Sequence, residues 1–211
     1  IGQVETALTV LLGQRYGLRL HTLVWDSSSC YFEAATHDLV QFGYSRDQRP
    51  DCPQIGTDLF IDVEHGFVPY GRSYEGNVVD AVRFSEAVMD LRSQYPDEED
   101  VTLIVDRGPV SEENLVLLRD LFYSVIAGVP LKGKWVTRVE GIRTFDQSFN
   151  LNGTRYGAQR QRVYLQDHRF YLYIYYNAKK ARQEQRRRQQ AMKACQQELE
   201  GLRLGQYQLK T

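Results

Sequence analysis

The sequence predicts an α/β protein in which helices cover a mixed β-sheet. Runs of alternating apolar and polar residues indicate strands, and apolar residues at helical spacing indicate helices between them. Their order along residues 18–126 is three strands, a helix, a strand, a helix and a strand. The chain has 211 residues, of which 42% are hydrophobic and 25% are charged, so it can bury a sizeable core and is neither disordered nor fibrous.

The first part of the chain contains one predicted helix and three predicted strands. Residues 3–16 carry apolar side chains at helical spacing, which predicts a short helix. Alternation over residues 18–25 predicts a strand that runs directly into Asp26. Residues 54–63 predict a second strand, and Gly66 predicts a hairpin into a third, antiparallel strand.

Helices and strands then alternate. Asp80 is expected to cap a helix that continues through residue 95, and its apolar residues share one face. The nearly continuous apolar run at 101–105 predicts a short strand of the buried type. Ser111 is expected to begin a second helix, and residues 122–126 predict a fifth strand. This order predicts a mixed sheet covered by helices.

The last third of the chain is less regular. Residues 132–162 alternate polar and β-branched residues with several glycines, which predicts antiparallel ribbons, and 169–176 predicts a tyrosine-rich strand. A long charged helix is expected from residue 178, and residues 206–211 predict the beginning of a further strand. Because the chain starts with Ile and stops inside this predicted strand, we expect it to be an excised part of a longer protein.

These patterns divide the chain into four predicted segments. They are an N-terminal helical segment at 1–17, the first part of the α/β core at 18–131, a β-rich insertion at 132–177, and a basic helix at 178–211 that leads into a missing remainder.

Charge is distributed unevenly along the chain. The net charge is −1, but residues 179–203 contain eight Lys or Arg and three Glu, so this segment carries +5 and the rest carries −6. A polyanion is therefore expected to meet local basic patches. The three cysteines are widely spaced, which fits neither a disulfide framework nor a metal clamp and predicts a reducing, cytoplasmic location. No apolar run approaches the ~18 residues of a membrane span.

Two carboxylates end predicted strands and are candidates for catalysis. Asp26 and Asp106 each follow a β-rich run, so adjacent strands could bring both to one edge of the sheet. Carboxylate oxygen is the ligand that Mg²⁺ prefers, and two divalent ions about 3.5–4 Å apart can activate the attacking oxygen and stabilise the leaving oxygen of a phosphodiester. The alternative is that these aspartates only cap turns.

Five stretches resemble a known family in their order and content. They are WDSSSCYFE at 25–33, GYSRD at 43–47, RPDCPQ at 49–54, YEGNVVD at 74–80 and VDRG at 105–108. In this order they resemble the DDE transposases of bacterial insertion sequences, of the insertion-sequence-four superfamily type. The RNase H-like fold has the same order of elements: three strands linked by hairpins, a helix, and a strand that ends in Asp.

The resemblance implies an RNase H-like catalytic domain with metal-dependent nuclease and strand-transfer activity. Its substrate would be double-stranded DNA, both transposon ends and target, and Asp26 and Asp106 would be the first two acids of a catalytic triad that binds Mg²⁺ or Mn²⁺. It implies a bacterial protein that associates with the nucleoid when bound to DNA, and it allows a homodimer in the DNA complex.

The third acid of that triad is not found. In the family it is a Glu on a later helix, within a Tyr, Arg, Glu, Lys pattern, and no glutamate from Glu112 onward has an Arg four residues before it. We expect it beyond Thr211, so this chain should hold metal poorly and be inactive by itself. The alternative is a catalytically inactive remnant that binds DNA or a partner. A two-aspartate phosphohydrolase would need a second Asp close to Asp26, and residues 27 and 28 are serines.

Six arginines are candidates for contacts to DNA phosphates. Two lie in the proline-containing loop at 43–54, where pairing with neighbouring aspartates is the alternative, one follows the second acid, and three are consecutive in the basic helix, where a solvated face is the alternative. They are Arg46, Arg49, Arg107, Arg186, Arg187 and Arg188.

Two further patterns are interpreted as packing. The tyrosines at 171, 173, 175 and 176 are more typical of sheet packing than of platforms on which nucleic-acid bases stack. On the last helix, Met192, Cys195, Leu199 and Leu202 form a stripe at helical spacing, which is expected to pack into a core.

Overall fold

The computed structural model describes residues 2–17, 19–34, 37–45 and 47–203. The chain divides into two compact units, one formed by residues 1–136 and 165–168 and the other by residues 137–164 and 169–211. The first unit contains α1 (Gly2–Tyr16), β1 (Thr22–Tyr31), β2 (Gln54–Asp62), β3 (Tyr70–Glu75), α2 (Asp80–Gln94), β4 (Thr102–Val105), α3 (Glu112–Asp120) and β5 (Ser124–Ala127).

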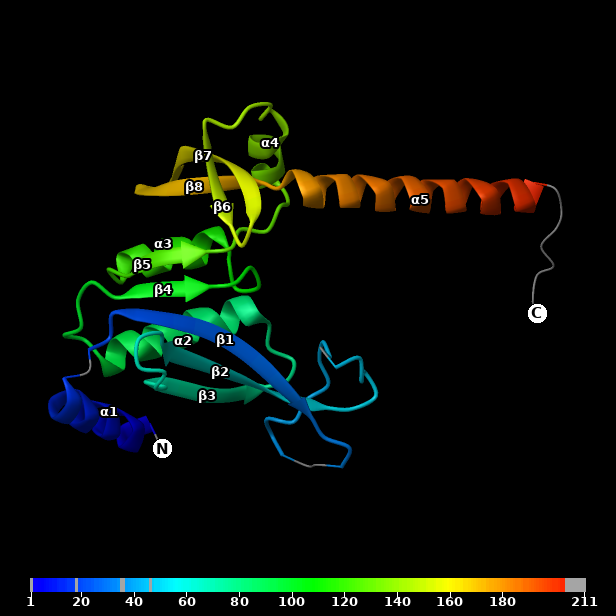
Figure 1. The fold of residues 1–211 in the computed structure, drawn as a ribbon. Coiled ribbons are helices and arrows are strands. Elements are labelled where there is room, and N and C mark those ends of the chain that lie inside the picture. The colour runs from blue at the N-terminus through cyan, green and yellow to red at the C-terminus, as the bar shows by residue number, and fades with distance from the viewer. Residues whose placement is uncertain (1, 18, 35–36, 46, 204–211) are drawn as a thin grey trace. The chain divides into compact units, whose positions relative to one another are not determined.

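The first unit is built on a five-stranded mixed sheet with the order β3-β2-β1-β4-β5 (Figure 1). β1 and β2 are antiparallel, as are β2 and β3, whereas β4 pairs parallel with both β1 and β5. The helices α2 and α3 lie in the connections that lead to the parallel strands β4 and β5. This order of elements and strands is the RNase H-like fold, so the predicted fold class is confirmed.

The main core lies between the sheet and α2. Alternate residues of β1 and β4 are buried, among them Leu23, Trp25 and Leu103. Their face packs against buried residues of α2, and the rings of Trp25 and Phe84 meet edge to face with centroids 5.1 Å apart. Full burial of one such side chain stabilises the fold by about 1.5–3 kcal/mol. Because burial alternates with a period of two, the opposite face of β1 carries Asp26.

The two helix starts differ from each other. Ser111 caps α3 as predicted, since its hydroxyl accepts a hydrogen bond from the backbone N–H of Asn114 at 3.1 Å. The prediction that Asp80 caps α2 is wrong: Val79 is the N-cap residue, and Asp80 is the first helical residue. Its carboxylate accepts a hydrogen bond from Arg83 one turn later.

The second unit contains a three-stranded sheet in the order β6-β7-β8 and a long helix. The strands are β6 (Gln147–Leu151), β7 (Thr154–Leu165) and β8 (His168–Tyr176), and the helix is α5 (Ala178–Arg203). β6 and β7 form the predicted antiparallel ribbon, joined by a two-residue turn in which Asn152 and Gly153 both have positive φ.

Residues 134–140 form a helix, α4 (Lys134–Glu140), where a ribbon was predicted. The segment follows Gly133, whose φ is +54°, and short-range bonds from Trp135 N–H to Lys132 O and from Val136 N–H to Gly133 O begin the turn. Its alternating residues therefore satisfy their backbone groups locally instead of in a ladder.

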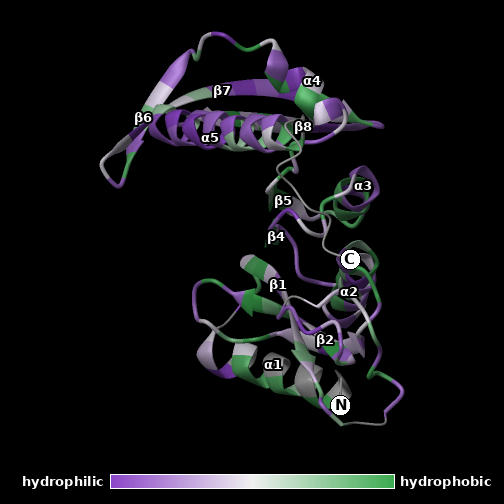
Figure 2. Cartoon of the chain, turned by 90° about the vertical axis from the view of Figure 1, so that its right-hand side faces the viewer, coloured by the Kyte–Doolittle hydropathy of each residue, from purple (hydrophilic) through white to green (hydrophobic). Residues whose placement is uncertain are grey.

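α5 is exposed along almost its whole length, and Figure 2 shows it coloured mainly as hydrophilic. Met192, Leu199 and Leu202 are 64%, 57% and 60% exposed, so the prediction that this stripe packs into a core is wrong within the described chain. The strand predicted at 206–211 lies outside the described residues. Among the described helices, none is long and apolar enough to cross a membrane.

Candidate functional site

Asp26 and Asp106, the two predicted catalytic residues, follow the last residues through which β1 and β4 pair with each other. The prediction that Asp26 ends a strand is wrong, because β1 continues to Tyr31 and Asp26 is the Cα partner of Leu59 in β2. Trp25 of β1 and Val105 of β4 are Cα partners, and Asp26 and Asp106 are the next residues of their chains. Trp25 and Val105 are buried in the core, whereas both aspartates are exposed. The structure therefore brings the two predicted acids to the same level of neighbouring strands, at the carboxyl end of β4.

Each carboxylate has a defined near neighbour. One Asp26 oxygen accepts the backbone N–H of Ser27 at 2.8 Å, which orients the carboxylate. On the other strand, Gly128 lies beside Asp106, since an Asp106 oxygen would be 3.5 Å from a β-carbon at that glycine, an ordinary contact distance. Within the described residues, neither aspartate forms an ion pair with Lys or Arg.

Carboxylate oxygens of this kind fit a hard divalent cation such as Mg²⁺ or Mn²⁺, which retains water at its remaining positions. Asp26 and Asp106 are the residues that would hold it. In the part of the chain that the structure describes, no group of three or more His, Cys, Asp or Glu is arranged to hold a metal ion. Among the described residues, the candidate metal ligands at this position are therefore the two carboxylates of Asp26 and Asp106.

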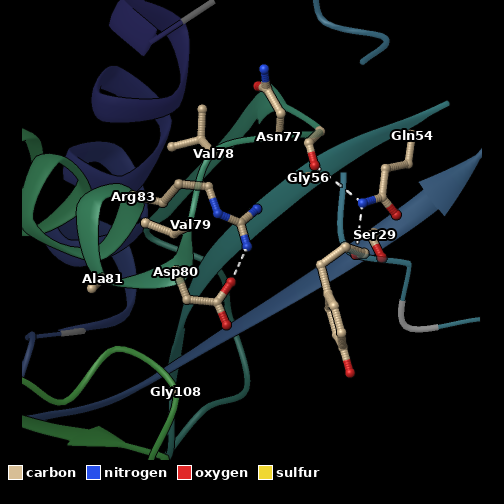
Figure 3. A pocket seen from close by; sticks show the side chains of 12 residues that line it. Ser29, Gln54, Gly56, Asn77, Val78, Val79, Asp80, Ala81, Arg83 and Gly108 are labelled. Carbon is tan, nitrogen blue, oxygen red and sulfur yellow. Dashed lines mark hydrogen bonds and ion pairs between the residues drawn. The ribbon is translucent and has the colours of Figure 1, made fainter. Parts of the chain in front are cut away.

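A pocket of about 350 Å³ lies in the same unit, between the sheet and the start of α2 (Figure 3). Ser29 of β1, Gln54 and Gly56 of β2 and Gly108, two residues after Asp106, all line it. The carboxyl-terminal half of β1 and the loop that carries the second acid therefore both contribute to its wall.

Three of the motif stretches that resemble the transposase family meet beside this pocket. The Gln54 side chain donates to the backbone oxygens of Tyr44 at 2.8 Å and Gly76 at 3.1 Å (Figure 3). A β-carbon on Gly43 would lie 2.1 Å from Gly76 O, and one on Gly76 would lie 2.0 Å from Gln54 O. Both positions require glycine because backbone approaches backbone directly. These motif residues hold the loop at 37–54 against the sheet.

A buried ionic cluster lies on the other side of the pocket and was not predicted. Arg83 of α2 is 5% exposed, and its Nη1 lies 3.4 Å from Oδ1 of the fully buried Asp58. Its Nη2 donates to Asp80 at 2.6 Å (Figure 3). Asp80 in turn touches the loop after Asp106, since one of its oxygens is 3.0 Å from the position of a β-carbon on Gly108.

One signal in the sequence could have indicated part of this cluster: Asp80 and Arg83 are three residues apart at the start of a helix. No signal indicated Asp58, because the apolar residues Ile55, Leu59 and Ile61 occupy the other phase of β2. A carboxylate at such a buried position needs a cation beside it.

The predicted DNA-contacting arginines have different surroundings. The guanidinium of Arg49 is paired with two carboxylates, those of Asp51 at 2.9 Å and Glu33 at 3.5 Å. It also lies 4.9 Å from the ring centroid of Tyr31. The bonds from Arg49 lower the pKa of Asp51 to about 2. Arg46 lies outside the described residues.

The remaining predicted arginines are exposed to solvent. Arg107 follows Asp106 directly and packs its stem beside Gly128. Arg186, Arg187 and Arg188 are exposed on α5, and Arg187 lies 3.6 Å from Glu184 in a surface ion pair. Such a pair contributes little to stability, so the guanidinium can exchange this partner for a phosphate.

The strand order and the two carboxylates define the class of the first unit, an RNase H-like fold with acids at the edge of the sheet. No protein-family model matches the chain, and neither does any curated protein. Solved structures with distant similarity include a piggyBac transposase synaptic complex with hairpin DNA, with 13% identity over 74% of this chain and 33% of that chain and a TM-score of 0.45.

Two structures of the Mos1 transposase are also similar. The paired-end complex with the left transposon end has 16% identity over 59% of this chain and 40% of that chain, with a TM-score of 0.37. The catalytic domain of the Mos1 mariner transposase has 14% identity over 59% of this chain and 57% of that chain, with a TM-score of 0.34. The chain thus spans less than two thirds of each of these solved chains.

Proposed function

We propose that this chain belongs to the catalytic region of a DNA transposase, a metal-dependent nuclease and strand transferase that acts at transposon ends. The observation that carries the proposal is the position of Asp26 and Asp106, one residue beyond the paired Trp25 and Val105 of adjacent parallel strands in an RNase H-like sheet. The motif stretches support it as well, since three of the five fold together beside the pocket at the start of α2, whose described lining includes neither Asp26 nor Asp106.

In this function Asp26 and Asp106 hold divalent metal. When bound, Mg²⁺ or Mn²⁺ supplies Lewis-acid activation of the attacking oxygen and counter-charge for the leaving 3′ oxygen. The Ser27 N–H holds the Asp26 carboxylate in one orientation. Exposed Arg107 is close enough along the chain to pair with a phosphate near the acids.

Duplex DNA is the proposed partner, and α5 is the proposed track for its phosphates. The helix carries eight of the 26 Lys and Arg residues against three Glu, and Arg186, Arg187 and Arg188 are exposed. Contacts of this kind set affinity and salt dependence without reading sequence. We place the catalytic core at 18–131 and the β-rich insertion at 132–177.

Mn²⁺-dependent binding of duplex DNA, followed by fluorescence anisotropy, tests the proposal, because this chain is expected not to nick DNA by itself. We expect Mn²⁺ to raise the affinity of the chain for the duplex and expect Asp26→Asn and Asp106→Asn to remove that gain, with folding checked by circular dichroism. Asp97→Asn, which removes an exposed carboxylate elsewhere, should keep the gain. An equal gain in all four proteins would contradict the assignment of the two acids.

A second candidate is a DNA- or partner-binding module without catalysis. It is favoured by the observation that the described residues bring only two acids together at this edge of the sheet. It predicts that the chain binds duplex DNA with the same affinity with and without Mn²⁺ and does not nick it. Affinity that depends on Mn²⁺ and on Asp106 would rule it out.

A further inference from the structure

The tyrosines of β8 lie on an exposed face of the sheet in the second unit. Tyr171, Tyr173 and Tyr175 occupy alternate positions of the strand and are 43%, 50% and 58% exposed. Ile174, on the other phase of the alternation, is 9% exposed. The sheet packing expected for these tyrosines therefore leaves a large part of each side chain exposed and available to another molecule.

The exposed rings form a continuous row. Tyr173 and Tyr175 have centroids 6.5 Å apart and planes within 12° of parallel. Phe149 of β6 continues the row, with its centroid 5.5 Å from that of Tyr175. Rings in a row of this kind can each offer a face or an edge to a base of a single strand.

Arginines lie at the same rings. The Arg160 guanidinium is 4.9 Å from the Tyr171 ring centroid, and that of Arg169 is 5.7 Å from it. The three strands contain four arginines and no Asp or Glu. Among the described residues, neither Arg160 nor Arg169 pairs with a carboxylate. This face, which we name the tyrosine face, combines aromatic surfaces with unneutralised positive charge.

This chemistry selects the occupant. The phosphates of a nucleic acid would pair with the positive charge of the arginines. Its bases would stack on the tyrosine rings, and stacking on an aromatic side chain is worth about 1–3 kcal/mol per base. In duplex DNA the bases are already stacked on one another, so only an unpaired strand offers its base faces. A partner protein with an apolar surface would leave the arginines without counter-charge.

We propose that the tyrosine face, formed by Phe149, Tyr171, Tyr173 and Tyr175 with Arg160 and Arg169, binds the unpaired nucleotides of a single DNA strand. This goes beyond the proposed metal-dependent function because the surface lies entirely within the second unit. Binding there requires neither Asp26 nor Asp106.

Fluorescence anisotropy with a labelled twelve-residue oligothymidylate and a duplex of the same length tests the proposal. We expect the chain to bind the single strand more tightly than the duplex at the same salt concentration. Tyr173→Ser and Tyr175→Ser should each weaken single-strand binding by about tenfold, in line with the loss of one stacking contact. Tyr173→Phe and Tyr175→Phe should remain within about threefold of the parent chain because they keep the ring.

Two control variants and a measurement of self-association separate the possible results. Tyr16→Ser removes an exposed tyrosine from the other unit and should leave binding unchanged. The double variant Asp26→Asn/Asp106→Asn should also bind the single strand normally, even if it abolishes metal binding. Unchanged affinity of both serine variants, or preference for the duplex, would overturn the proposal. Self-association of the parent chain that Tyr173→Ser abolishes, measured by sedimentation, would assign the face to a second copy and overturn it as well.

Discussion

Nη1 of Arg83 occupies the space that a side chain on Gly56 would need: a β-carbon at Gly56 would lie 1.9 Å from this nitrogen. Gly56 is on the buried phase of β2, and Arg83 reaches it from the first turn of α2. The missing side chain at one residue of the sheet thus makes room for a guanidinium beside the buried Asp58.

We expect Gly56→Ala to destabilise the fold by about 3 kcal/mol, because the guanidinium must move away from Asp58 and weaken a buried ion pair. Urea denaturation followed by circular dichroism measures the change. Gly141→Ala, where a β-carbon meets no atom within 4 Å, should change the free energy of unfolding by less than about 0.5 kcal/mol.

A double-mutant cycle makes this prediction specific. In an Arg83→Met background the ion pair is already absent, so adding Gly56→Ala should cost much less than it does alone. Equal costs of Gly56→Ala in both backgrounds would show that the glycine matters for another reason.

We expect the carboxyl of Asp51 to titrate at about pH 2, well below its ordinary value of 3.8, because Arg49 donates hydrogen bonds to it. A lowered pKa means that this pairing favours the folded loop above pH 3.8 and that the benefit is lost as the pH falls through about 2. An NMR titration of the carboxyl carbon measures the midpoint.

Arg49→Gln should return the Asp51 midpoint toward 3.8, whereas Arg72→Gln, which removes an exposed arginine that pairs with Asp90, should leave it in place. An Asp51 that titrates near 3.8 in the parent chain would show that the Arg49 pairing does not persist in solution.

Removal of a single arginine from α5 should lower the salt dependence of duplex binding. If Arg186, Arg187 and Arg188 each contact one phosphate, each change to Gln reduces the slope of log affinity against log salt by about 0.9. Anisotropy titrations at several salt concentrations give this slope. Gln189→Ala on the same exposed helix is the matched control and should keep the parent slope. Unchanged slopes in the arginine variants would exclude α5 as a phosphate track.

Alternation and helical spacing were sufficient to predict the order of elements in the first unit. In β2, apolar residues at alternate positions, Ile55, Leu59 and Ile61, indicated the strand. They did not indicate which face is buried, because the buried phase consists of Gln54, Gly56, Asp58, Phe60 and Asp62. Asp26 and Asp106 could be predicted to lie near each other because each follows a run of alternating residues and these runs pair in parallel, Trp25 with Val105. The end of β1 could not be predicted, since this strand continues past Asp26 to Tyr31.

Features that depend on distant partners could not be predicted. The cluster of Asp58 and Arg83 requires knowledge of which helix crosses β2, and a local pattern does not contain this. The exposure of Tyr173 depends on whether another layer of the protein covers that face of β8. A sequence that alternates between two kinds of residue occurs in strands with a covered face and in strands with an exposed one, so the pattern could not decide this. At 134–140, residues compatible with a strand form a helix because their backbone bonds close locally.

The central claim is that Asp26 and Asp106 bind one divalent ion together, and a Mn²⁺ titration followed by electron paramagnetic resonance tests it most directly. The account predicts one Mn²⁺ bound by the parent chain, affinity reduced by about tenfold or more in Asp26→Asn and in Asp106→Asn, and unchanged affinity in Asp97→Asn. Parent-like Mn²⁺ binding by both Asp26→Asn and Asp106→Asn would contradict it.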